Sequence, residues 1–103
     1  IILDENEFSS LPLQLAGLPR LHTLKLAENP MEELGPEILK FPNLRHLDLW
    51  KSDIRRVHKA LGQTTSLQYL DLRQTYIGTN DLAWLIKARP DIDIKSTYGC
   101  NCN

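Results

Sequence analysis

Histidine and carboxylate side chains are the residues of this sequence that could perform acid–base chemistry or hold a metal ion. His46, Asp48 and Asp71 could be drawn as such a site, because imidazole and carboxylate groups are common general bases and metal ligands. The other histidines are His22 and His58. None of the three has a cysteine or serine partner at a plausible distance, and no glycine-rich phosphate loop occurs. We therefore predict no catalysis, no metal site and no cofactor.

The only cysteines, Cys100 and Cys102, stand at the end of the sequence. With one residue between them they could form only a strained disulfide, and a zinc site would lack further ligands. We predict a mobile tail with free thiols, which slightly favours a reducing, intracellular compartment. The alternative is a disulfide to another chain.

Composition excludes several classes of partner. The 103 residues, one domain's worth, carry 12 Lys and Arg against 13 Asp and Glu, a formal net charge of −1. Binding to nucleic acid or to an anionic membrane surface requires clustered basic residues. No apolar run approaches the ~18–20 residues that span a bilayer. We predict no nucleic-acid or membrane partner.

A repeated motif organises the chain. Residues 21–31 read L-x-x-L-x-L-x-x-N-x-(apolar), and the pattern returns at Leu44 and Leu67, 23 residues apart each time. Each L-x-x-L-x-L segment predicts a short strand whose alternate leucines face inward. The inward residues form two columns, Ile1, Leu24, Leu47, Leu70 and Leu3, Leu26, Leu49, Leu72.

This motif resembles the leucine-rich repeat family over nearly the whole chain. The resemblance implies an α/β solenoid, a right-handed superhelix with a parallel concave sheet and with short helices or 3₁₀ turns on its convex side. We expect a domain of about four and a half repeats at 1–95 and a tail at 96–103. The first repeat begins partway through its strand, so we expect the chain to be cut from a longer array. In the family an asparagine holds the turn after each strand. Asn6 and Asn29 fit, but Ser52 and Thr75 do not, so the later turns should be less tightly tied.

The segments that return to the next strand differ from one another. We predict a turn or 3₁₀ piece in 11–19, a short helix after Pro36, and a helical turn from Arg56 to Gly62. A longer helix, capped by Thr79 or Asn80, should run over 81–89 and bury Leu82, Leu85 and Ile86. The last strand, 91–95, should place Ile92 beside Leu70 and Ile94 beside Leu72.

Family members usually bind through the outward positions of their concave strands. Trp, Tyr and Arg are enriched in binding hot spots. The predicted contact residues are His46, Trp50, Tyr69, Arg73, Lys25, Asp48, Asp71 and Lys51. The alternative for Trp50 is that it lies flat on its own sheet and stacks on Arg73. We also expect Ala27 to face outward and Lys25 to form a cross-strand ion pair with Asp48.

The function that this pattern favours is binding of another protein through the concave face. The alternative is an architectural segment of a larger protein, which could associate with a second copy through the uncovered strand edge at 1–3.

Overall fold

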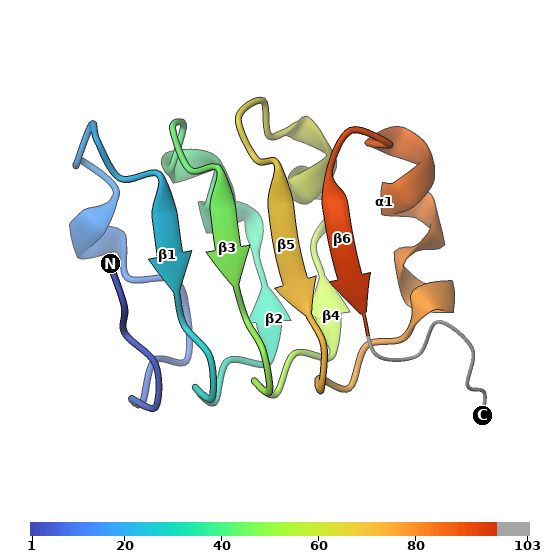
Figure 1. Cartoon of the computed structure of the whole chain (residues 1–103), viewed down its shortest axis with the longest axis horizontal. Helices are drawn as coiled ribbons and strands as arrows, with labels where there is room; N and C mark the ends of the chain where they lie inside the picture. The colour runs from blue at the N-terminus through green and yellow to red at the C-terminus, as the bar shows by residue number, and fades with distance from the viewer. Residues whose placement is uncertain (97–103) are drawn as a thin grey trace.

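A four-stranded parallel sheet forms one side of the molecule in the computed structural model, which describes residues 1–96 except the side chain of Thr79 (Figure 1). Its strands are β1 (Thr23–Lys25), β3 (His46–Asp48), β5 (Tyr69–Leu72) and β6 (Asp93–Ser96), in the order β1-β3-β5-β6. Residues 1–3 flank β1 through a bridge from Ile2 to Lys25. The predicted tail, with Cys100 and Cys102, lies outside the described residues, except that Ser96 belongs to β6.

The leucine columns form the core. Leu24 pairs with Leu47 and Leu47 with Leu70, so the 23-residue period is the register of the sheet. The strand leucines are fully buried: Leu24, Leu26, Leu47, Leu49, Leu70 and Leu72 each have 0% exposure. Burying one such side chain contributes about 1.5–3 kcal/mol. The predicted solenoid core is confirmed, but the prediction that Ile1 faces inward is wrong, since its exposure is 48%.

The return segments lie behind the sheet (Figure 1). They contain 3₁₀ helices η1 (Leu13–Leu15), η2 (Pro36–Lys40), η3 (Lys59–Gln63) and η4 (Thr79–Leu82), and the α-helix α1 (Ala83–Ala88). The 3₁₀ form predicted for the first return segment and the helical start at Pro36 are confirmed. The longest segment begins earlier than predicted, at Thr79, because Asp81 accepts the backbone N–H of Gly78. Its Ile86 is 43% exposed, so the prediction that it is buried is wrong.

A second, two-stranded parallel sheet was not predicted. It consists of β2 (Glu33–Leu34) and β4 (Arg56–Val57), so Arg56 lies in a strand and the helical turn starts later. The N–H of Ala60 donates to Nδ1 of His58, which caps η3. His58 therefore has a structural role as the cap of a 3₁₀ helix.

The register predicted for the last strand is wrong by two residues. Ile94 pairs with Leu70 and Ser96 with Leu72. Ile92 directly precedes β6 and is buried, with 6% exposure. It belongs to the end of the longer helical return segment and packs against the core there. As a result Lys95, not Asp93, lies beside Asp71.

Strands β1, β3 and β5, and the segment 1–3 beside β1, are each followed by a turn through a residue in the left-handed region. The φ angles there are 57–61° at positions 23 residues apart: Glu5, Glu28, Lys51 and Gln74. A non-glycine residue costs about 1–2 kcal/mol in this conformation. The cost recurs in every repeat because the chain must leave the sheet at the same point.

The asparagine position ties neighbouring repeats together. Asn29 is buried, and its Oδ1 accepts the backbone N–H groups of Asn6 and Phe8, both at 3.1 Å. Its Nδ2 donates to the carbonyls of Leu3 and Ala27. The side-chain hydroxyl groups of Ser52 and Thr75, by contrast, donate within their own repeats, to the carbonyls of Leu49 and Leu72. The expected looser ties of the later turns are confirmed.

Replacing Asn29 should therefore loosen the first repeat. We expect Asn29→Ser to lower the free energy of unfolding by about 2 kcal/mol, because two partly buried N–H groups lose their acceptor. Chemical denaturation measures the loss, and hydrogen exchange should speed up at residues 6 and 8. Asn6→Ser is the matched control, since the Asn6 amide donates only at an exposed site. An equal effect of the two variants would contradict this role of Asn29.

Candidate functional site

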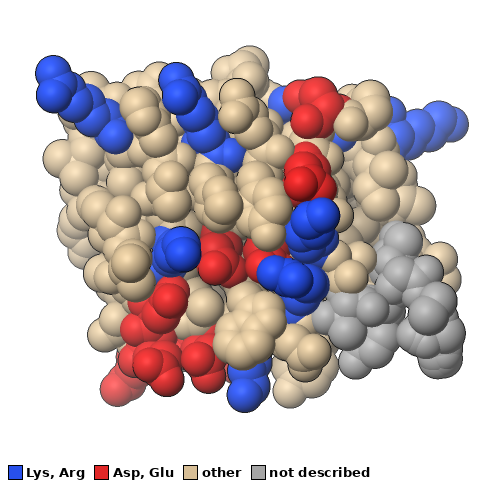
Figure 2. Space-filling view, in the orientation of Figure 1, with Lys and Arg blue, Asp and Glu red and all other residues tan. Residues whose placement is uncertain are grey.

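The register of the four-stranded sheet brings the predicted contact residues of neighbouring strands to one face. Register places Thr23, His46, Tyr69 and Asp93 in one row and Lys25, Asp48, Asp71 and Lys95 in the next. Trp50 and Arg73 follow β3 and β5 at equivalent positions, and Lys51 occupies the left-handed turn. Acidic side chains gather at the lower left of this face, whereas both charges mix over the strands (Figure 2). We call His46, Trp50, Tyr69 and Arg73 the contact face.

An aromatic pair occupies the centre of this face. The rings of His46 and Tyr69 stack with their centroids 4.3 Å apart and their planes at 27°. Both residues are half-buried. Burial, and then the negative charge of Asp71, raise the pKa of the Tyr69 hydroxyl, so this group stays a neutral donor. The pair places two stacked aromatic rings next to charged groups.

Arg73 closes onto Asp71 in a bidentate ion pair. Its Nη2 donates to Oδ2 of Asp71 at 2.8 Å and its Nε to Oδ1 at 3.1 Å. Asp71 is buried, whereas the Arg73 side chain remains 51% exposed. Burial alone would raise the pKa of Asp71, but the hydrogen bonds and charge of Arg73 outweigh it, and the pKa is lowered. Among the described residues no cation–π contact joins Arg73 to Trp50, so the predicted stacking on Arg73 is wrong.

The cation next to Trp50 is instead Lys51. Its Nζ lies 5.8 Å from the centroid of the indole ring and 4.0 Å from a carboxylate oxygen of Glu28. The predicted ion pair of Lys25 with Asp48 is also wrong. These residues are register neighbours, but within the described residues no ion pair joins them.

Sequence analysis missed a structural role of the aspartates. Oδ1 of Asp48 accepts the N–H of Trp50 at 2.9 Å, and Oδ1 of Asp71 accepts the N–H of Arg73 at 3.0 Å. These donors lie where each strand ends and the sheet ladder no longer supplies an acceptor. The N–H of Ala27 donates instead to Oδ1 of Asp4 in the preceding repeat, at 2.9 Å. The recurrence of aspartate 23 residues apart was the available signal.

Ala27 does not belong to the face. It is buried with 6% exposure, so the prediction that it faces outward is wrong. Strand β1 ends before Ala27, and its small side chain is covered where the chain turns away from the sheet.

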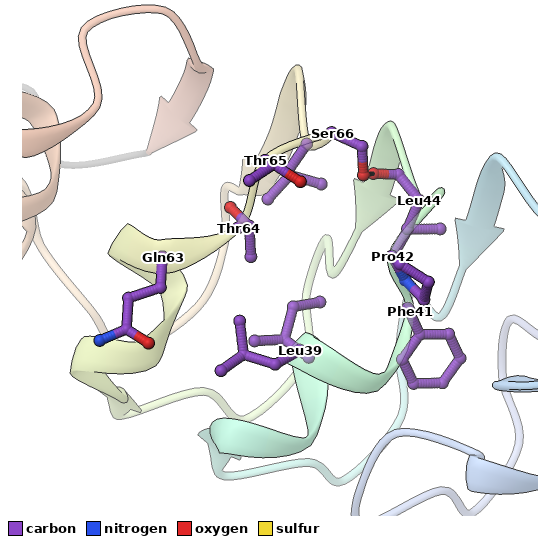
Figure 3. A pocket seen from close by; sticks show the side chains of 10 residues that line it. Leu39, Phe41, Pro42, Leu44, Gln63, Thr64, Thr65 and Ser66 are labelled. Atoms are coloured by element: carbon purple, nitrogen blue, oxygen red, sulfur yellow. Dashed lines mark hydrogen bonds between the residues drawn. The ribbon is translucent and has the colours of Figure 1, made fainter.

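The described part of the chain has no cluster of metal ligands, and a small cavity lies between two repeats. Among residues 1–96, no three His, Cys, Asp or Glu side chains lie close enough to hold a metal ion. A cavity of about 100 Å³ lies between the η2–β3 and η3–β5 connections (Figure 3). Ser66 closes it by donating to the carbonyl of Leu44 at 2.7 Å. This volume is below the ~300–1,000 Å³ of ligand pockets, so the cavity is a packing seam between repeats. None of the helices in this part of the chain is long and apolar enough to cross a membrane.

The Asp71–Arg73 pair should contribute to stability in a pH-dependent way. We expect Asp71→Asn to lower the free energy of unfolding by about 2 kcal/mol at neutral pH, because it removes a charge-assisted acceptor. The pKa of Asp71 is depressed in the fold, so its contribution is full above the unfolded value of about 3.9 and fades as pH falls below it. Denaturation at several pH values measures this. Asp48→Asn, which keeps an acceptor for Trp50 and breaks no ion pair, is the matched control. Equal losses in the two variants would contradict the role of Arg73.

Comparison with known proteins agrees with this geometry. The sequence matches the leucine rich repeat family over residues 19–77, more than half of the chain. The structure is similar to that of an LRR protein of Leptospira interrogans, with a TM-score of 0.77 and 27% sequence identity. That similarity covers 90% of this chain and 24% of the Leptospira protein, so the chain spans about a quarter of that protein's length. With its 23-residue register and its stacked leucine columns, the chain belongs to the leucine-rich repeat family.

Proposed function

We propose that this chain binds a partner protein through the contact face. Domains of this family generally mediate protein–protein interaction and are typically binding modules rather than enzymes. The observation that carries the proposal is the grouping of Trp50 and the stacked His46–Tyr69 pair on two adjacent strands. Half-buried aromatic side chains of this kind provide contact area at a low cost in side-chain entropy.

The charges around these rings favour a protein partner. Glu28, Asp71 and Asp93 each have a cation of this chain within 4.0 Å. A charge that is already paired costs less to cover than an isolated charge, because its partner partly replaces the lost water. The face therefore offers an aromatic centre with a polar rim, the arrangement typical of interface cores.

The front of the molecule, which extends beyond the four residues of the contact face, is large enough for a specific complex. The molecule spans 39 × 28 Å in the plane of Figure 1, the side on which the sheet lies. A standard interface buries about 800 Å² on each partner. A partner that covers the sheet and its rims could reach this area, whereas contact with the strands alone would give weaker, transient binding.

The proposal predicts that Trp50 is a hot spot. We expect Trp50→Ala to weaken partner binding by about 2 kcal/mol or more, roughly 30-fold in Kd, because the indole would lose its buried contact area. Thermal stability should change little, since Trp50 does not belong to the leucine core. Calorimetric titration of the purified partner and a melting curve measure the two effects.

The partner can be found by differential capture. Proteins retained by the immobilised wild type and by Leu39→Ala, but not by Trp50→Ala, are candidates. Leu39 is the control because its side chain is 43% exposed on η2, away from the sheet. A lower melting temperature of Trp50→Ala with partner binding intact would instead make Trp50 a structural residue and overturn the proposal.

A second candidate function is self-association through the open edge beside β1. Ile1 and Ile2 are 48% and 70% exposed there. The backbone of Lys25 forms hydrogen bonds to one side of residues 1–3. Its N–H donates to the carbonyl of Ile1 at 2.9 Å, and its carbonyl accepts the N–H of Leu3 at 2.7 Å. The outer side presents backbone groups to which another strand could pair.

The mass of this chain in solution tests that candidate. If the edge pairs with a second copy, sedimentation of the wild type should show a dimer, and Ile2→Lys should restore the monomer because a charged edge opposes pairing. Trp50→Ala should leave the dimer intact. A wild type that stays monomeric at millimolar concentration would exclude the candidate.

A further inference from the structure

We propose that Asp48 and the aromatic rings on either side of it form a recognition site for an arginine side chain of the partner protein. This inference rests on the proposed function and names the chemistry that the contact face would recognise. Two independent features of the described residues support it, the charge balance of the strands and the spacing of the aromatic side chains.

The first feature is that Asp48 lacks a cation. Of the carboxylates that β3, β5 and β6 carry in the described part of the chain, Asp71 pairs with Arg73 at 2.8 Å and Asp93 with Lys95 at 3.4 Å. Asp48 has no cation within 4.0 Å, although Lys25 lies opposite it in the register. Its Oδ1 accepts the N–H of Trp50, and among the described residues no donor lies on Oδ2. Asp48 therefore has an open acceptor oxygen and no direct ion pair, although the charge of the nearby Arg73 guanidinium interacts with it.

The second feature is the position of the rings. Residues two apart on a strand share a face and lie about 6.6 Å apart along it. His46 lies two residues before Asp48 on β3, so their side chains share a face, and Trp50 follows the end of β3 with its N–H bonded to Oδ1 of Asp48 at 2.9 Å. The His46 ring is held in place by its stack on Tyr69 at 4.3 Å. The carboxylate thus has one aromatic residue before it on the strand and another directly after the strand.

A guanidinium group fits this combination better than an ammonium group. It is planar, so it stacks on aromatic faces, and it presents donors in a fixed fork that match a carboxylate. The attraction of a cation to an aromatic ring adds to the ion pair. An arginine carried by a partner segment would satisfy the open Oδ2 and supply the charge that Asp71 and Asp93 already receive from their own chain.

The test uses the peptide acetyl-Gly-Arg-Gly-amide as the probe and the amide NMR spectrum of the whole chain as the readout. The Trp50 amide reports on Asp48, because it donates to that carboxylate at 2.9 Å. The Arg73 amide is the internal control, since it donates to Asp71 at 3.0 Å, where the cation is already present. We expect the probe to shift the Trp50 amide in a saturable way and to leave the Arg73 amide nearly unchanged.

Matched probes and variants separate this site from general charge attraction. The same peptide with citrulline, which keeps the shape but not the charge, should bind at least tenfold more weakly, and the lysine peptide should bind several-fold more weakly. Asp48→Asn should reduce affinity at least tenfold and Asp93→Asn less than twofold. Lys25→Met, which removes a nearby positive charge and leaves Asp48 intact, should raise affinity several-fold.

Specific outcomes would overturn the inference. They are no shift at Trp50, equal binding of the arginine and citrulline peptides, or equal losses in Asp48→Asn and Asp93→Asn. The effect of Lys25→Met decides the case even if Asp48→Asn fails to fold. Partner binding that depends on Trp50 but not on Asp48 would refute the arginine site alone, whereas partner binding insensitive to Trp50 would refute the proposed function.

Discussion

Stacking of leucine side chains at a constant interval is the constraint on which the rest of this structure depends. One repeat cannot cover its own apolar face, so each coil buries its leucines against the next. Leu24, Leu47 and Leu70 are fully buried at directly paired positions, which leaves the strands no freedom to slip. A shift by one residue would turn every inward leucine toward water and bring the polar residues inside. Burial of the columns therefore also determines which side chains face outward.

The same register repeats the way in which polar backbone groups are satisfied at the ends of the strands. The chain leaves the sheet through a left-handed residue in each repeat, and the N–H that the ladder leaves over at the strand end is met by an aspartate. Asn29 adds a tie between the first two repeats that Ser52 and Thr75 do not reproduce. Asp48 and Asp71 thus both hold the backbone, but Asp71 is buried and only the half-buried Asp48 keeps exposed surface. This structural role explains why aspartate recurs at the same position of the repeat. The two residues differ in their surroundings, because Asp71 forms an ion pair with Arg73 and Asp48 forms none.

Much of the fold was predictable because it is periodic. The strands, the leucine columns and the 3₁₀ segments follow from spacing and from proline and glycine positions. Prediction failed where the period ends. Ile92 was assigned to the last strand, but it is buried ahead of it, and Ile94 takes the place beside Leu70. Arg56 was assigned to a helical turn but pairs with Glu33 in a second sheet. In both places a contact with another segment overrides the local pattern, and no property of the segment alone reveals that contact.

For the contact face, the sequence by itself determined which residues share one side of the sheet, because alternation along a strand and a fixed period place Trp50, His46 and Tyr69 together. The tertiary structure decided how their charges are paired. Arg73 was expected near Trp50, yet it folds onto Asp71, and Lys51 lies by the indole ring instead. Lys25 was expected on Asp48 and does not reach it. The physical reason is that a period specifies backbone positions to within one strand spacing, whereas an ion pair depends on side-chain rotamers and on distances below 4 Å.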